Sequence, residues 1–271
     1  MQQHCLQLMV GAPYLLHAVL AFSSSHLSFL HPSERRYRVT ATFHYDLSLA
    51  SYSSQISTGL DASNADSLLG CCYLHTMLAF RNLQLDDDSQ EGSALTWLRT
   101  MQGTSILRSN LHPCLNNSVW HPLNLESRSW EEVICNHLDS GDSWASKASQ
   151  ALHQFCGVNS KSVLEENLYE DPLCRFCQLM QLEIGRDNIG MFMSFIGRLR
   201  PSFVELLDRN DPKAMMILCY WCALLSQIDQ WWIVASATSE CLRLCKLLYV
   251  VPDQRIQDLL EFPASKCGFT S

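Results

Sequence analysis

The run at residues 214–225, AMMILCYWCALL, is the longest uninterrupted apolar stretch of this 271-residue chain, and it constrains the fold more than any other segment. It follows Asp211, a residue type that caps helix N-termini, and Pro212, a residue type that suits the first helical turn. It is too short to cross a bilayer, which takes roughly 18 apolar residues or more. A helix that is apolar on every side must be enclosed by other elements. We therefore expect residues 214–225 to form a buried helix.

The rest of the chain repeats apolar residues at spacings of three and four, the periodicity of a helix face, and no stretch alternates as a strand does. Helices are expected at residues 13–30, 65–83, 92–107, 202–209 and 253–262, among others. Two more start signals are Ser33 followed by Glu34, and Asp171 followed by Pro172. Residues 108–130 hold two prolines and little periodicity, which predicts an irregular surface excursion. The pattern as a whole predicts one compact all-α domain over residues 1–271.

The amino-acid composition limits which classes of partner this chain can bind. Apolar residues make up 47% of the chain and charged residues 17%, against about 25% charged in average globular proteins. More of the chain must therefore be buried or must line an apolar cavity. The net charge is −8, from 19 Lys and Arg against 27 Asp and Glu. Because nucleic-acid binding needs clustered basic residues, we expect no direct nucleic-acid partner.

The 13 cysteines lie mostly inside apolar runs, where a free thiol packs as a small hydrophobe. This usage predicts a reducing compartment, the cytosol or the nucleus. Three pairs have helical spacing: Cys174 and Cys177, Cys219 and Cys222, and Cys241 and Cys245. Structural zinc usually takes such pairs from short loops, and these lie within helices, so we expect core packing and no metal. Gly-rich phosphate loops and H-E-x-x-H are absent, so no cofactor is expected.

The opening apolar segment, residues 13–27, has some likeness to a signal peptide. No Lys or Arg precedes this segment, because the first one in the chain is Arg35. Pro13 and His17 also interrupt the apolar run. A secretory signal needs a basic start and a clean apolar core. We therefore expect a core helix here.

A small-molecule pocket is expected between residues 65–83, 214–226 and 230–249, because these segments are too apolar for surface helices yet carry polar exceptions. His75 and Tyr73 are the candidate catalytic residues. The candidate ligand-binding residues are His26, Cys71, Cys72, Tyr220, Trp221, Trp231 and Trp232. The alternative is structural: a buried histidine usually bonds a backbone carbonyl, and tryptophans usually belong to a core.

Several of these segments resemble the ligand-sensing C-terminal domain of fungal zinc-cluster transcription regulators, in the sterol-uptake-regulator branch. The first matching segment supplies Tyr14, Leu15, Leu16, His17, Val19, Leu20, Ala21, Phe22, Ser23, Ser24, His26 and Leu27. Further matches are Ala41, His44 and Leu47, then Trp97, Leu98 and Gly103, and the closing segments CYWCALLSQIDQWWI and IQDLLEFP. The resemblance implies an all-helical domain with a deep pocket for an apolar ligand. It does not identify the pocket residues.

Two hypotheses follow. The chain shows no basic six-cysteine cluster, and the matching helix starts soon after Met1. If Met1 is the native start, we expect a free-standing pocket that catalyses a cofactor-free cyclisation, cycloaddition or isomerisation of a terpenoid- or polyketide-like metabolite, by holding it near its reactive geometry. The alternative is a non-enzymatic sensor of sterol or lipid from such a regulator. A homodimer is compatible with both hypotheses.

Overall fold

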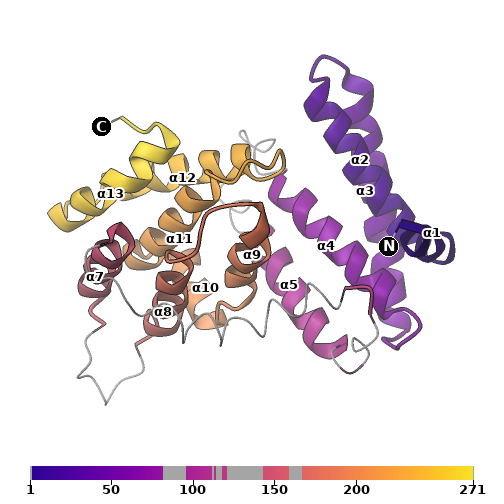
Figure 1. Cartoon of the computed structure of the whole chain (residues 1–271), viewed down its shortest axis with the longest axis horizontal. Coiled ribbons are helices and arrows are strands. Elements are labelled where there is room, and N and C mark those ends of the chain that lie inside the picture. The colour runs from indigo at the N-terminus through magenta and orange to yellow at the C-terminus, as the bar shows by residue number, and fades with distance from the viewer. Residues whose placement is uncertain are drawn as a thin grey trace. The chain divides into compact units, whose positions relative to one another are not determined.

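The structure is a computed structural model that describes residues 2–81, 96–111, 113, 118–120, 143–158 and 167–270 (Figure 1). Over those ranges every regular element is a helix and no strand is present, which confirms the all-α prediction. The sequence predicted one domain. Contacts divide the chain into two compact units, unit 1 of residues 1–82 and 88–125 and unit 2 of residues 83–87 and 126–271. Within the described ranges no helix combines the length and apolar character needed to cross a membrane.

Unit 1 is built around a pair of long helices. Its elements are α1 (Gln2–Gly11), α2 (Pro13–Leu30), α3 (Arg35–Thr58), α4 (Ala65–Arg81) and α5 (Thr96–Leu111). Helices α2 and α3 lie side by side along most of their length, and α2 also packs on α4 (Figure 1). The opposite side of α4 carries α5, through the edge-to-face rings of Phe80 and Trp97 at 5.2 Å. The opening segment is thus a core helix of unit 1, as expected.

Unit 2 encloses one helix on several sides. Its elements are α7 (Trp144–Cys156), α8 (Glu170–Leu179), η3 (Arg186–Asn188), α9 (Ile189–Gly197), α10 (Pro201–Asp208), α11 (Pro212–Leu225), α12 (Val234–Tyr249) and α13 (Gln254–Cys267). Helix α11 contacts α7, α8, α10, α12 and α13, and every residue from Ala214 to Leu225 is buried. The Asp211 carboxylate caps α11 by accepting from the N–H groups of Lys213 and Ala214 at 3.1 and 2.9 Å. The expectation from residues 214–225 is confirmed.

Several predicted boundaries are wrong. Helix α3 starts after Glu34, whose carboxylate pairs with Arg36 at 3.2 Å instead of capping. Helix α8 starts before the predicted cap, so Asp171 lies in its first turn and binds the Arg175 guanidinium at 2.9 Å. The pair of Asp171 and Arg175 has the i,i+4 spacing that stabilises a helix from within. Helices α1 and α7 were not predicted, although Ser143 caps α7 in the ordinary way.

The predicted surface excursion at residues 108–130 also changes. Its first residues, up to Leu111, form the last turn of α5. Ser118 is buried, and the Trp120 indole N–H donates to the Asp66 carbonyl of α4 at 2.7 Å. Residues 118–120 therefore pack against α4 within unit 1. Residues 112, 114–117 and 121–130 lie outside the described residues.

Candidate functional site

The predicted catalytic histidine lies at the centre of a buried polar network in unit 1. His75 of α4 is 3% exposed, and its Nε2 lies 2.7 Å from Ser48 Oγ of α3. Ser48 Oγ also lies 2.7 Å from the backbone oxygen of Tyr14 in α2. A carbonyl oxygen can only accept, so the one Ser48 hydroxyl proton goes to Tyr14 and His75 Nε2–H donates to Ser48. Three helices are joined through this chain of hydrogen bonds, called here the His75 network.

The network sets the chemistry of His75. Burial lowers the pKa of His75 to about 4, so the ring is neutral at pH 7. The rings of Tyr45 and Tyr52 lie nearly perpendicular to the His75 ring, at 5.4 and 5.2 Å between ring centroids. Because Nε2 already carries the shared proton, His75 cannot accept the Ser48 proton as a general base through that atom. The geometry fits the structural alternative, in which a buried histidine has its hydrogen bonds satisfied, and catalysis by His75 stays a prediction.

The neighbours of His75 on α4 have partners of their own. Cys71 Sγ lies 3.6 Å from His75 Nε2, and burial raises the pKa of the Cys71 thiol to about 12. Cys72 Sγ lies 3.2 Å from the Thr104 hydroxyl of α5. The Tyr73 ring packs edge to face with Trp120 at 5.7 Å and is partly buried. Cys71 joins the His75 network, whereas Cys72 and Tyr73 contact other parts of unit 1.

Two residues that hold this site together were missed from the sequence. Ser48 is the one fully buried serine of α3, and its helix gives no apolar stripe that would mark its inner face. Gly70 is the second: a Cβ there would come within 2.7 Å of the Trp120 ring. The isolated glycine in the apolar run LLGCC is the sequence signal that could have predicted a close contact at Gly70.

The other predicted ligand-binding residues fall into two places. His26 lies on α2, about 18 Å along the helix axis from Tyr14, and stacks with Phe29 at 6.4 Å between ring centroids. Trp221 is buried in unit 2, and its indole N–H donates to the Phe192 carbonyl at 2.9 Å. Trp232 is buried and Trp231 half-buried, in the turn that precedes α12. The Trp221 indole N–H thus binds a backbone carbonyl, as is usual for a tryptophan in a protein core.

Tyr220 fills a gap in the backbone hydrogen bonding of α13. Pro263 lies inside that helix and has no N–H to donate to the Leu259 carbonyl four residues earlier. The Tyr220 hydroxyl donates to this carbonyl at 2.8 Å. A buried carbonyl would otherwise be unsatisfied. Tyr220 is therefore a structural partner of the proline, which explains how α13 continues to Cys267.

A groove of about 860 Å³ opens in unit 1 between α1, α2, α3 and the turn before α4. Its lining combines polar and apolar groups in similar measure: Gln7, Leu8, Gly11, Ala12, Pro13, Tyr14, Ala50, Ser51, Ser54, Gln55, Thr58, Asp61, Ser63, Asn64 and Ser67. The Tyr14 hydroxyl in the groove lies 2.6 Å from Ser67 Oγ, and the Tyr14 carbonyl belongs to the His75 network. The volume lies within the range of small-molecule sites. The predicted apolar pocket draws on α4 of unit 1 and on α11 and α12 of unit 2, and it stays a prediction.

A possible set of metal ligands lies in unit 2. The sulfur atoms of Cys219, Cys241 and Cys245 lie within 4.8 Å of one another, and all three residues are buried. The expectation of no metal rests on cysteine pairs close in sequence, whereas this set combines Cys219 of α11 with two cysteines of α12. Cys174 and Cys177 are more exposed, and Cys177 Sγ lies 3.8 Å from His153 Nδ1.

Comparison with known proteins finds one distant relationship over most of the chain. A Zn(2)-C6 fungal-type transcription factor of Gibberella zeae is 22% identical over 278 aligned residues. The alignment covers 93% of this chain and 53% of that protein, so the chain spans about half the length of the relative. No family model and no solved structure matches the chain. The chain is thus distantly similar to a fungal transcription factor, in agreement with the coarser part of the resemblance.

Proposed function

We propose that this chain is an effector-sensing region of a fungal transcription regulator and that it binds an amphipathic small molecule without transforming it. The similarity to a Zn(2)-C6 transcription factor over 93% of the chain carries the proposal. The motif resemblance to the sterol-uptake-regulator branch suggests the ligand class, a hydroxylated sterol, terpenoid or polyketide. We further propose that the region acts in the nucleus or cytosol.

The groove of unit 1 is the binding site that we propose. Leu8, Ala12 and Pro13 can cover the apolar body of a ligand, and the polar atoms of Tyr14 and Ser67 can bind a hydroxyl or carbonyl group. Small-molecule sites commonly combine an apolar surface with a few polar groups that fix orientation. Ligand contact at Tyr14 would act directly on the His75 network, because the Tyr14 carbonyl accepts from Ser48.

The geometry at His75 supports sensing over catalysis. Its Nε2 proton is committed to Ser48, and the Ser48 proton to a carbonyl. A network whose hydrogen bonds are satisfied holds helices in place and offers no acid or base at that pair of atoms. We therefore treat turnover as an outcome of the test below.

The test uses two matched tryptophan variants of α3. Ser54 lines the groove, and its neighbour Ser53 is exposed and does not. Binding of ergosterol and of hydroxylated terpenoids to the 271-residue chain is measured by calorimetry, with product analysis by mass spectrometry. We expect Ser54→Trp to weaken binding at least tenfold and Ser53→Trp to leave it unchanged.

Conversion of any bound compound into a product would contradict sensing and favour the enzyme hypothesis. Equal binding by both variants would place the ligand outside the groove. Fusion of the chain to an unrelated DNA-binding domain provides the cellular readout. Reporter expression should respond to the ligand in the Ser53→Trp fusion and not in the Ser54→Trp fusion.

A further inference from the structure

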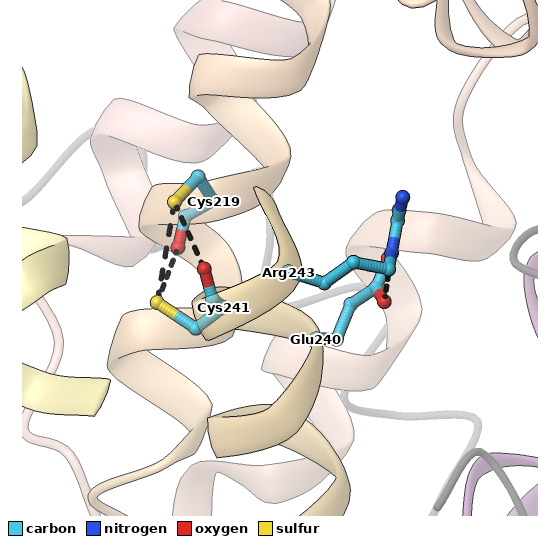
Figure 2. A network of polar contacts seen from close by, with 4 residues as sticks. All are labelled: Cys219, Glu240, Cys241 and Arg243. Carbon is cyan, nitrogen blue, oxygen red and sulfur yellow. Dashed lines mark hydrogen bonds and ion pairs between the residues drawn. The ribbon is translucent and has the colours of Figure 1, made fainter. Parts of the chain in front are cut away.

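Thiols from three helices converge in the core of unit 2. Cys219 of α11 lies 3.6 Å from Cys245 and 4.0 Å from Cys241, both of α12, measured between sulfur atoms. Cys267, the last residue of α13, places its sulfur 3.8 Å from that of Cys245. Figure 2 shows Cys219 and Cys241 facing each other across the two helices, each sulfur directed to the backbone oxygen of the other residue, at 3.8 and 3.7 Å.

These separations match the coordination shell of a soft metal ion. With zinc–sulfur bonds of about 2.3 Å, the sulfur atoms of a tetrahedral site lie roughly 3.8 Å apart. Three of the sulfur–sulfur distances, at 3.6, 3.8 and 4.0 Å, lie around that value. The sulfur atoms of Cys219, Cys241 and Cys245 all lie within 4.8 Å of one another, so a cation between these three would need little movement of α11 and α12, and Cys267 would join it from the side of Cys245. Thiolate ligands select zinc and Cu⁺ over hard cations.

The helix geometry explains why the sulfurs meet. Cys241 and Cys245 are four residues apart on α12 and so lie on one face, a spacing also used by paired histidine ligands on helices. That face packs on α11 and on α13, which bring Cys219 and Cys267. Cys267 is 9% exposed and is followed by an exposed glycine, Gly268. The cluster is thus closed within the core but adjoins the surface at the end of α13.

The positive charge of Arg243 does not neutralise the cysteine cluster. Arg243 lies between Cys241 and Cys245 in the sequence of α12, and its guanidinium is already paired with both oxygens of buried Glu240 at 2.7 and 2.8 Å (Figure 2). This pair is neutral as a whole and does not supply the positive charge that buried thiolates need.

We propose that Cys219, Cys241 and Cys245 bind one thiophilic closed-shell cation, Zn²⁺ or Cu⁺, with Cys267 as the fourth sulfur. Each ligating thiol loses its proton to solvent as its sulfur–metal bond forms, and no electron is transferred. The ion ties α11, α12 and α13 together and so has a structural role. The proposal does not depend on the ligand-binding function proposed for unit 1.

The test titrates metal into the reduced 271-residue chain under anaerobic conditions with a phosphine reductant. Co²⁺ serves as the spectroscopic substitute for Zn²⁺, and Cu⁺ is delivered from a chromophoric chelator. We expect one ion per chain, a thiolate-to-cobalt charge-transfer band that Zn²⁺ abolishes, and proton release in weak buffer. Stronger binding of Zn²⁺ or of Cu⁺ decides between the two ions, and either result supports the site.

Variants assign the site to its cysteines. Cys245→Ala removes the sulfur that contacts both Cys219 and Cys267, and it should lower metal affinity at least 100-fold. The matched control is Cys222→Ala on α11, a fully buried thiol outside the set, which should change affinity less than threefold. Circular dichroism of the metal-free proteins checks folding. If Cys245→Ala does not fold, Cys267→Ser at the end of α13 replaces it, with an expected loss of at least tenfold.

The proposal is overturned if the wild-type chain gives neither the charge-transfer band nor proton release. It is equally overturned if a folded Cys245→Ala variant, or Cys267→Ser in its place, binds metal as tightly as Cys222→Ala. In both cases the thiols only pack against one another.

Discussion

The two units use buried polar groups in different ways. In unit 1, His75 and Ser48 bond to each other, and the chain of bonds ends on a backbone carbonyl of a third helix. In unit 2, the hydroxyl of Tyr220 and the indole of Trp221 each go directly to a backbone carbonyl. The network of unit 1 therefore contains a histidine, His75, whose ordinary pKa lies near neutral pH. The Tyr220 hydroxyl and the Trp221 indole of unit 2 do not change charge in that pH range.

The comparison shows where a perturbation should act. A side-chain network is lost as a whole when one member is removed, because the partner left behind is buried and unsatisfied. A single bond to a backbone carbonyl can be replaced by another donor at the same place. Unit 1 should therefore respond strongly to mutation and to pH, and unit 2 should tolerate a compensated change.

The largest effect is expected for the His75 network. His75→Ala should lower the free energy of unfolding by about 1–3 kcal/mol, since Ser48 loses its donor in a buried site. Ser48→Ala should be similarly harmful, and the double variant should cost less than the sum by about 1 kcal/mol. Urea denaturation measures all three. Ser57→Ala, a serine at an exposed site of α3, is the control and should add to His75→Ala without coupling. Additivity of Ser48→Ala and His75→Ala would contradict the network.

The pH dependence of stability should distinguish the units next. The folded-state pKa of His75 is lowered from 6.5 to about 4, so between these values the unfolded chain binds a proton that the folded chain does not. Stability should therefore rise with pH through this window and fall as pH drops from 6.5 toward 4. One proton corresponds to a slope of about 1.4 kcal/mol per pH unit at most.

The measurement is urea denaturation at several pH values, with His75→Gln beside the wild type. A second contribution of the same sign comes from His44, whose pKa is lowered by burial and by the His17 ring, with Nδ1 atoms 3.0 Å apart. The difference between wild type and His75→Gln isolates His75. An identical slope in both proteins would show that His75 is not buried in the neutral form.

The smallest effect is expected in unit 2. Tyr220→Phe removes the donor to the Leu259 carbonyl and should cost about 1 kcal/mol of unfolding free energy. Pro263→Ala restores a backbone N–H that can donate to the same carbonyl. In the Pro263→Ala background, Tyr220→Phe should therefore be nearly neutral. If Tyr220→Phe costs the same in both backgrounds, the hydroxyl does not compensate for the proline.

Helix periodicity and capping made much of the fold predictable. The enclosed helix at residues 214–225, its Asp211 cap, and the buried faces of α2 and α4 follow from residue spacing along one chain segment. Helix ends were less predictable. The helix α3 begins two residues after Ser33, and α13 passes through Pro263 because Tyr220 of the distant helix α11 donates to the Leu259 carbonyl.

The sequence by itself determined that this chain is helical and that residues 214–225 are enclosed, because these depend on local spacing and on the cost of exposing apolar surface. Only the tertiary structure decided the partners. Ser48 meets His75 from 27 residues away, and Cys219 meets Cys245 from 26 residues away. Such pairings depend on how two helices pack and on which of their turns are in contact. The periodicity within a single segment does not determine these contacts.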